Sequence, residues 1–192
     1  MSTQVIIGIT GKMASGKGRV GEYLTRRYDV DKVKTSYFFR EVLNLFDIPE
    51  SRENLQTLST FMRSTYGENI LARALVKYAQ KMTKPIVIVD GVRRYTDIEN
   101  LKKLPNFFLI YVHTDQHIRY KRYIQRNENP GDAEMSFETF LKEDSAEPEQ
   151  QIESLREHAH VTVDNNQTPE QLDTQIEKIL QTISPGLVKK NI

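Results

Sequence analysis

The sequence predicts an α/β fold, a three-layer α/β/α sandwich in which helices cover both faces of a parallel, five-stranded sheet. Two observations support this prediction. Short apolar runs alternate with helical periodicity along the chain, and a glycine-rich phosphate-binding pattern follows the first apolar run. Alternation of this kind builds parallel sheets, so ligands are expected at the carboxyl ends of the strands.

The expected strands are short and rich in β-branched residues. They cover 5–9, 30–35, 85–90, 107–112 and 161–163. The run 85–90 is apolar up to its final Asp90, which is typical of a buried parallel strand. We therefore expect the end of this strand to reach a functional site.

The expected helices follow from apolar residues at helical spacing. After a first helix that starts at residue 19, they cover 37–46, 53–66, 70–82, 96–104, 115–126, 136–144, 149–157 and 169–183. Pro49 and Gly67 end two of them, while Thr168 caps the last helix and Pro169 takes its first position.

Composition narrows the class of protein. The chain has 192 residues and is 38% hydrophobic, which fits one domain over 1–183 with a tail over 184–192. A net charge of +1 gives no support for broad nucleic-acid binding. Cysteine is absent, which excludes disulfides and thiolate metal sites, and the four His lack ligand spacing. With neither a signal peptide nor a membrane span visible, we expect a cytoplasmic protein with a small-molecule partner.

The strongest motif is a phosphate-binding loop directly after the first strand. Its residues are Gly11, Lys12, Met13, Ala14, Ser15, Gly16, Lys17 and Gly18, followed by Arg19. In such a loop, backbone N–H groups surround a phosphate, the lysine reaches the β- and γ-phosphates, and a Ser or Thr hydroxyl binds Mg²⁺. Here Gly18 stands at the hydroxyl position. The start of the following helix adds partial positive charge to this anion site.

Asp90 is the candidate metal ligand, because it leaves a buried strand beside the loop and Gly91 allows the chain to turn there. A helix-capping or turn aspartate is the structural alternative. Since Gly18 lacks a hydroxyl, Ser15 and Thr10 are further candidates to supply one.

Arginines are the third feature, because phosphoryl transfer gathers negative charge that an enzyme must neutralise. Candidates near the mouth of the sheet are Arg40, Arg63, Arg93 and Arg94. A second group shares one helix face, at Arg119, Arg122 and Arg126, ahead of a segment, 127–132, that could act as a lid. Solvated surface arginines are the alternative interpretation for each of them except Arg93 and Arg94, whose position directly after Asp90-Gly91 places them near the site.

Taken in this order, the motifs resemble the nucleoside-monophosphate-kinase branch of the P-loop kinases, which includes adenylate kinase and dephospho-coenzyme A kinase. The resemblance is greatest to little-characterised P-loop kinase-like proteins of archaea and bacteria. It spans nearly the whole chain and rests on 11–18, 35–40, Arg63 with 66–67, 90–93, the three arginines of the helix 115–126, and 163–166.

The resemblance implies a kinase domain with an acceptor-binding helical insert at about 37–82 and a lid at about 119–147. It implies ATP and Mg²⁺ as cofactors. The loop 11–19 would hold ATP and Asp90 would hold Mg²⁺, while Asn165 would lie where the last loop passes the adenine. It makes Lys17, Arg93, Arg122 and Arg126 catalytic, and it gives the acceptor phosphate to Arg40, Arg63, Arg93 and Arg94. Arg19 replaces the family's Thr, and Ser36-Tyr37 replaces its Gly-Asp.

Three functions follow from these residues. The first is a kinase that acts on a nucleoside or deoxynucleoside monophosphate, which needs no strong base. The second is phosphorylation of a hydroxyl, as in dephospho-coenzyme A, for which an acid such as Asp29 or Asp31 is needed near the acceptor. The third is an ATP-binding regulatory module without transfer to a small molecule.

Overall fold

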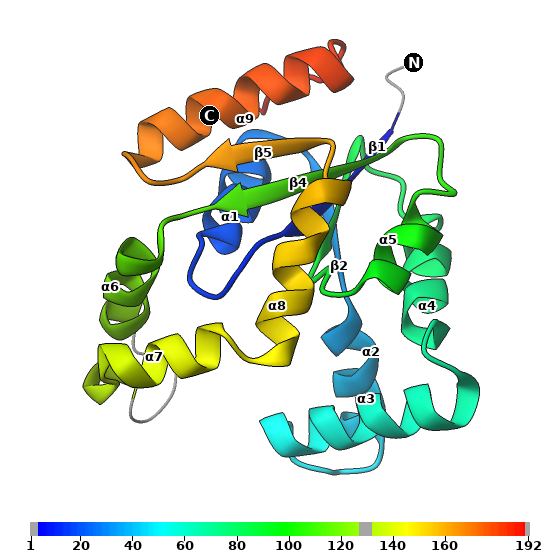
Figure 1. The fold of residues 1–192 in the computed structure, drawn as a ribbon. Coiled ribbons are helices and arrows are strands. Elements are labelled where there is room, and N and C mark those ends of the chain that lie inside the picture. The colour runs from blue at the N-terminus through cyan, green and yellow to red at the C-terminus, as the bar shows by residue number, and fades with distance from the viewer. Residues whose placement is uncertain (1–3, 127–131, 191–192) are drawn as a thin grey trace.

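The chain folds around one parallel sheet, and the computed structural model describes residues 4–126 and 132–190. Its five strands are β1 (Val5–Thr10), β2 (Val30–Lys34), β3 (Ile86–Asp90), β4 (Phe107–His113) and β5 (Val161–Asp164). They lie in the order β2-β3-β1-β4-β5, and every neighbouring pair is parallel. The predicted α/β sandwich with a parallel five-stranded sheet is confirmed (Figure 1).

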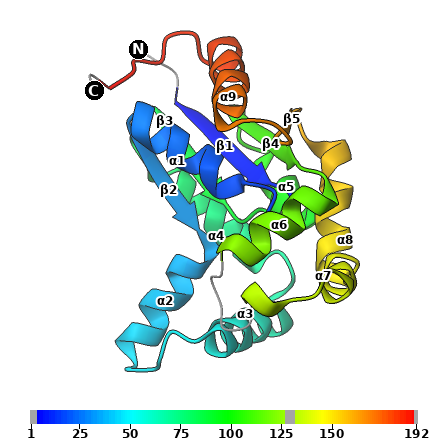
Figure 2. The same cartoon turned by 90° about the vertical axis from the view of Figure 1, so that its left-hand side faces the viewer.

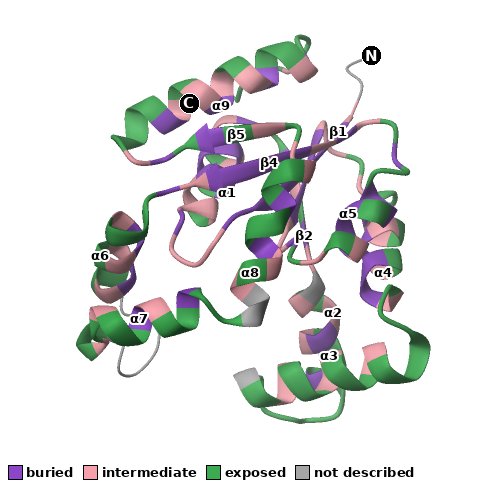
Figure 3. Cartoon of the chain, viewed as in Figure 1, coloured by how far each residue is buried: buried purple, intermediate pink, exposed green. Residues whose placement is uncertain are grey.

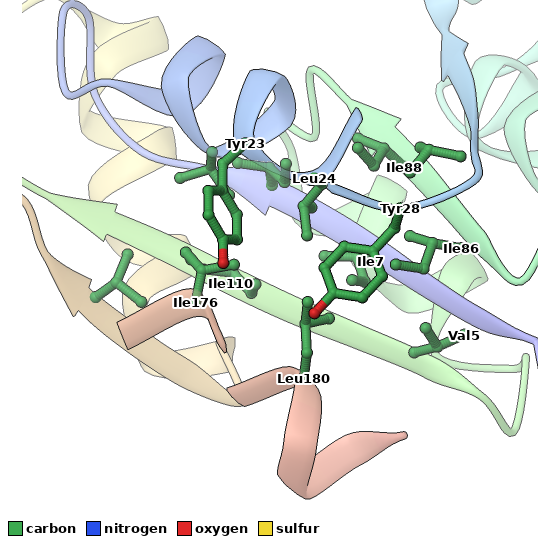
Figure 4. Close-up of a cluster of buried hydrophobic side chains, with 14 of the residues drawn as sticks. Val5, Ile7, Tyr23, Leu24, Tyr28, Ile86, Ile88, Ile110, Ile176 and Leu180 are labelled. Carbon is green, nitrogen blue, oxygen red and sulfur yellow. The ribbon is translucent and has the colours of Figure 1, made fainter. Parts of the chain in front are cut away.

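Helices α1 (Lys17–Arg27) and α9 (Pro169–Ile183) cover one face of the sheet (Figure 2). Their apolar sides pack on alternate residues of the strands, so that Leu24 of α1, Ile176 of α9 and Ile7 of β1 belong to one cluster (Figure 4). All three of these side chains are fully buried. Because period-2 alternation directs these strand residues to one face, the two helices and the sheet share a single core.

The opposite face is covered by α4 (Ile70–Ala79), α5 (Tyr95–Leu101) and the 3₁₀ turn η2 (Leu155–His158), which follows α8 (Glu147–Ser154). Their buried residues pack on the other set of strand side chains, which includes Val87 and Leu109. The three central strands, β1, β3 and β4, are buried on both faces (Figure 3). This explains why their sequences read as continuous apolar runs.

The helical insert between β2 and β3 begins with α2 (Thr35–Leu45) and α3 (Arg52–Tyr66), which project from the sheet beyond its carboxyl edge (Figures 1 and 2). Much of α3 is exposed (Figure 3). Ser51 caps α3 by accepting the backbone N–H of Asn54 at 3.1 Å. Gly67, with φ +95°, ends it, as the sequence predicts.

The predicted lid corresponds to α6 (Gln116–Arg126), the short turn η1 (Asp132–Glu134) and α7 (Phe137–Asp144). The segment 127–131, expected to form its mobile part, lies outside the described residues. The two helices are joined by the rings of Tyr120, Phe137 and Phe140, and Tyr120 Oη donates to the Met135 carbonyl at 3.0 Å. The helical part of this segment therefore has its own small aromatic core.

Several predicted boundaries were wrong by a few residues, because tertiary contacts decide where terminal turns stop. Helix α4 ends at Ala79 rather than 82, α5 ends at Leu101 rather than 104, and α8 starts at Glu147 rather than 149. The tail over 184–190 is also not separate from the domain. The Lys190 N–H donates to the Arg27 carbonyl at 2.8 Å, and Tyr28 and Lys189 form an antiparallel bridge.

No helix in the parts of the chain that the structure describes combines the length and the apolar character needed to span a bilayer.

Candidate active site

The loop between β1 and α1 has the backbone shape of a phosphate-binding loop. Gly11 and Gly16 have φ values of +145° and +95°, and a Cβ atom at Gly16 would lie 2.0 Å from the Asn165 amide nitrogen. Ala14 also has a positive φ, at 57°. Gly16 serves as the N-cap of α1, so the loop delivers N–H groups to the positive end of the helix.

Lys17 bends back over this loop. Its Nζ donates to the carbonyl oxygens of Gly11 at 2.5 Å and Lys12 at 2.8 Å. Burial, together with the nearby charge of Arg93, lowers the pKa of Lys17 to about 8. A partly buried ammonium held above the loop in this way is ready to exchange two carbonyl oxygens for phosphate oxygens.

Charged residues from separate parts of the sequence converge on Lys17. Arg93 and Arg126 lower its pKa through their charge, whereas Asp90 and Glu149 raise it. The structure therefore brings the first loop, the end of β3, the end of α6 and the start of α8 to one point. Three of the predicted catalytic residues, Lys17, Arg93 and Arg126, share this point, as does the predicted metal ligand.

Contrary to the prediction, the three arginines of α6 do not line one shared site. Arg119 is buried, and its guanidinium forms two hydrogen bonds with Asp144, at 2.5 and 2.8 Å. Arg122 donates to the Asn165 carbonyl at 2.9 Å, which places it beside Gly16. Of the three, Arg126 is the one whose charge reaches Lys17. Tertiary pairing thus gives each arginine a different neighbour.

Asp144, at the end of α7, is the centre of a buried polar cluster beneath the loop. Its side chain is 2% exposed and accepts from Arg119, from Gln116 and from Lys12 Nζ at 3.2 Å. Arg119 also donates to the Met13 carbonyl at 3.3 Å. The pair Arg119–Asp144 therefore joins both lid helices to the first half of the loop.

This network also controls the ionisation of Asp144. Burial alone raises the pKa of this carboxyl group, but the hydrogen bonds from Arg119 and Gln116 outweigh it and lower the pKa to about 2. Because the folded-state pKa is below the ordinary value of 3.8, the ionised carboxylate stabilises the fold above about pH 4. That stabilisation is lost as the pH falls through about 2.

Two predicted nucleotide contacts have other roles in the structure. The Asn165 side chain, 6% exposed, donates to the Ser15 carbonyl at 2.8 Å and so supports the loop from below rather than facing an adenine. Arg19 points away from the loop and pairs with Asp173 of α9 at 3.0 Å. This pairing accounts for an arginine where the resembled kinases have a threonine.

Asp90 fits a magnesium site only in part. Its register partner on β2 is Lys34, and the Lys34 Nζ lies 2.5 Å from an Asp90 carboxylate oxygen. Thr10 Oγ1 is committed to the Val92 carbonyl at 2.8 Å, while the buried Ser15 hydroxyl has no hydrogen-bond partner. No group of three or more His, Asp or Glu side chains that could hold a metal occurs in the described chain. Asp90 can therefore supply one carboxylate, with phosphate oxygens and water as the other ligands.

A second group of charges lies where the insert meets the end of β3. Arg94 Nη1 donates to the Glu68 carboxylate at 2.9 Å, and Arg63 donates to the Glu68 carbonyl at the same distance. Burial and the charge of Arg94 lower the pKa of Arg63. The buried Asp97 fixes the backbone here by accepting the N–H groups of Arg93 and Arg94, each at 3.1 Å. Both arginines are thus held at Glu68, Arg94 by a hydrogen bond to its exposed carboxylate and Arg63 by one to its backbone carbonyl, with the carboxylate 3.8 Å from Arg63 Nη1.

Three other predicted candidates lie elsewhere. Arg40 is paired with Glu50 inside the insert. Asp31, at the start of β2, accepts the backbone N–H groups of Thr83 and Lys84. Asp29 precedes β2 and pairs with Lys84 Nζ at 3.0 Å. Both acids are therefore at the amino-terminal edge of the sheet, opposite the loop, where they cannot serve as a base for an acceptor.

Sequence reasoning missed four residues of this region: Asp144, Glu149, Lys34 and Glu68. Lys34 could have been predicted, because it is the last residue of β2 and the site was expected at the carboxyl ends of the strands. The three acids carried no such signal. They lie on helices or turns of polar sequence, where an acid ordinarily faces solvent.

Comparison with known proteins shows which family the chain belongs to. A family model described as "AAA domain" matches residues 7–150. A UPF0200 protein of Sulfurisphaera tokodaii is 30% identical over 183 residues, covering 95% of this chain and 99% of the relative. A UPF0200 protein of Methanocaldococcus jannaschii is 27% identical over 187 residues, covering 96% and 93%.

Solved structures show the same fold. A shikimate kinase from Bacteroides thetaiotaomicron superposes with a TM-score of 0.61 at 14% identity, covering 93% of this chain and 98% of its own. The protein TT1252 from Thermus thermophilus superposes with a TM-score of 0.58 at 20% identity, covering 94% and 98%. With the phosphate-binding loop and the parallel sheet, these matches identify the chain as a member of the UPF0200 family that carries an AAA domain and has a P-loop kinase-like fold.

Proposed function

We propose that this protein transfers the γ-phosphate of ATP to a nucleoside or deoxynucleoside monophosphate. The observation that carries the proposal is the convergence of the charges of Lys17, Arg93 and Arg126 at the loop, together with a second arginine pair, Arg63 and Arg94, within 4 Å of the Glu68 carboxylate. The first group has the charge to hold a donor's phosphates. The second has the charge to hold an anionic acceptor.

In this proposal the loop N–H groups and Lys17 hold the donor, and Arg63 and Arg94 exchange Glu68 for the acceptor phosphate. Arg93 lies next to Arg94 in the chain and near Lys17 in space, so it can neutralise the phosphoryl group between the two sites. Mg²⁺, when bound beside Asp90, would neutralise the β- and γ-phosphate oxygens. An acceptor phosphate is already a nucleophile, so alignment and charge neutralisation are sufficient for an in-line transfer.

A coupled assay of ADP release tests this function across a panel of nucleoside monophosphates, deoxynucleoside monophosphates and dephospho-coenzyme A. We expect turnover with at least one monophosphate. Turnover with dephospho-coenzyme A alone would favour the hydroxyl acceptor instead. Measurable ATP affinity without turnover of any panel member would favour the regulatory module and contradict the kinase.

The acceptor site gives a prediction of its own. We expect Arg63→Ala to raise the KM for the monophosphate about 10- to 100-fold, because one charge-assisted hydrogen bond contributes about 1.5–3 kcal/mol. Glu68→Gln should lower the same KM, since it removes the competing carboxylate. Steady-state kinetics with varied acceptor provide the measurement. Arg73→Ala, an exposed arginine on α4, is the control. An equal KM in the Arg63→Ala and Arg73→Ala variants would place the acceptor elsewhere.

The ionisation of Lys17 predicts how ATP binding depends on pH. In the free protein this ammonium is charged below about pH 8 and loses its proton above that value. Since the charged form binds phosphate, we expect ATP affinity to be constant near neutral pH and to fall up to about 10-fold per pH unit above 8. Calorimetric titrations between pH 7 and 9.5 measure this. Lys17→Arg, which stays charged, should flatten the profile. A flat wild-type profile would contradict the assignment.

A further inference from the structure

A carboxylate of the chain itself lies on the phosphate-binding loop. Glu149 Oε2 accepts the backbone N–H of Met13 at 2.8 Å. The N–H groups of such a loop are the groups that bind phosphate oxygens in nucleotide complexes. The charged Glu149 oxygen that accepts the Met13 N–H therefore lies where an oxygen of a phosphate would bind.

The electrostatics of Lys17 support the same position. Glu149 raises the pKa of Lys17, so its carboxylate lies within the field of the ammonium that reaches the β- and γ-phosphates. Lys17 Nζ, meanwhile, is bonded to the carbonyls of Gly11 and Lys12. Donors on both sides of the anion site are thus satisfied by groups of the protein.

The place of Met13 in the loop indicates which phosphate is imitated. Gly16 and Lys17, in the second half of the loop, begin α1, and the N-terminus of a helix takes the inner phosphates. Met13 belongs to the first half, on the side of the loop that meets the lid helices through Arg119. Because the charge of Glu149 also acts on Lys17, which reaches the β- and γ-phosphates, the terminal phosphate is the one that the carboxylate imitates best.

Helix α8 is anchored so that it holds Glu149 at the loop. Ile152 and Leu155 are buried against the core, and the Glu153 carboxylate accepts from Tyr111 Oη at 2.8 Å. At the other end, Asp144 ties α7 to Lys12. Glu149 itself is only partly buried, so rotation of its side chain is sufficient to vacate the loop.

We propose that Glu149 is a specificity-determining residue of the donor site, which a nucleoside triphosphate must displace from Met13 and a diphosphate need not. This inference rests on the proposed binding of nucleotides at Gly11–Gly18. Two anions cannot share one N–H donor, so the fraction of molecules with Glu149 in place reduces the apparent affinity for ATP. Affinity for ADP, which has no γ-phosphate, is spared.

Titration calorimetry with ATP and ADP, each without Mg²⁺, tests the inference on three proteins: wild type, Glu149→Gln and Glu157→Gln. We expect Glu149→Gln to bind ATP about 10-fold more tightly, because a neutral amide holds the Met13 N–H less strongly than a carboxylate does. Its affinity for ADP should change less than about 2-fold. Glu157→Gln, at an exposed position in the turn η2 that follows α8, should match wild type for both nucleotides.

An unchanged ratio of ATP to ADP affinity in Glu149→Gln would overturn the inference while leaving nucleotide binding intact. So would weaker ATP binding, which would make Glu149 a ligand of the nucleotide rather than its competitor. Failure of all three folded proteins to bind either nucleotide would overturn the proposed function, and this inference with it. Thermal unfolding of each variant establishes that it is folded.

Discussion

Replacing Lys17 with alanine is expected to abolish kinase activity and weaken ATP binding by at least about 100-fold. Two charge-assisted hydrogen bonds to phosphate, at about 1.5 kcal/mol each, correspond to about 3 kcal/mol, and each 1.4 kcal/mol is a factor of ten. Lys17 holds the carbonyls of Gly11 and Lys12, and among the residues that the structure describes it forms no ion pair that a phosphate would have to break. Calorimetric titration with ATP measures the loss.

The matched control is Lys121→Ala, which removes an exposed lysine from α6. This variant should bind ATP as wild type does. Thermal unfolding of both variants separates lost binding from lost folding, and we expect the Lys17→Ala protein to remain folded because removing a desolvated charge has little cost. Normal ATP binding by folded Lys17→Ala protein would show that the phosphate-binding loop has been misassigned.

Removing Asp144 is expected to have the largest effect on stability. Asp144→Ala leaves Arg119 buried without its partner, and breaking a buried ion pair costs about 3–5 kcal/mol. Chemical denaturation measures the change in the free energy of unfolding. Lys142→Ala in the same helix breaks only the exposed pair with Glu138, for which we expect about 0.5 kcal/mol or less. Similar losses in the two variants would contradict a buried role for Asp144.

The double variant Arg119→Met/Asp144→Leu separates stability from positioning. Apolar residues of similar volume can replace a buried ion pair without loss of stability, so this protein should be more stable than Asp144→Ala. It still lacks the contacts of Arg119 with the Met13 carbonyl and of Asp144 with Lys12. We therefore expect about 10-fold weaker ATP binding, equivalent to one lost loop contact. Wild-type affinity would show that the pair only stabilises the fold.

The fold was predictable because its signals are local. Apolar runs gave the five strands, the glycine pattern gave the loop, and Thr168 and Pro169 gave the start of α9, as the structure has it. Helix ends were less predictable. The helix ends at Ala79 and Leu101 depend on which helix residues the sheet covers. The periodicity of the sequence does not predict that packing.

The candidate site was predictable only in part, for a related reason. The sequence by itself determined the loop, Lys17 and the position of Asp90 and Arg93 after a buried strand, because each of these lies within a few residues of a recognisable pattern. Only the tertiary structure decided what faces them. Lys34 lies beside Asp90 because β2 and β3 are neighbours in the sheet. Asp144 and Glu149 contact the loop from helices more than 120 residues away along the chain. Pairings of opposite charges over such separations depend on packing geometry, which no local pattern encodes.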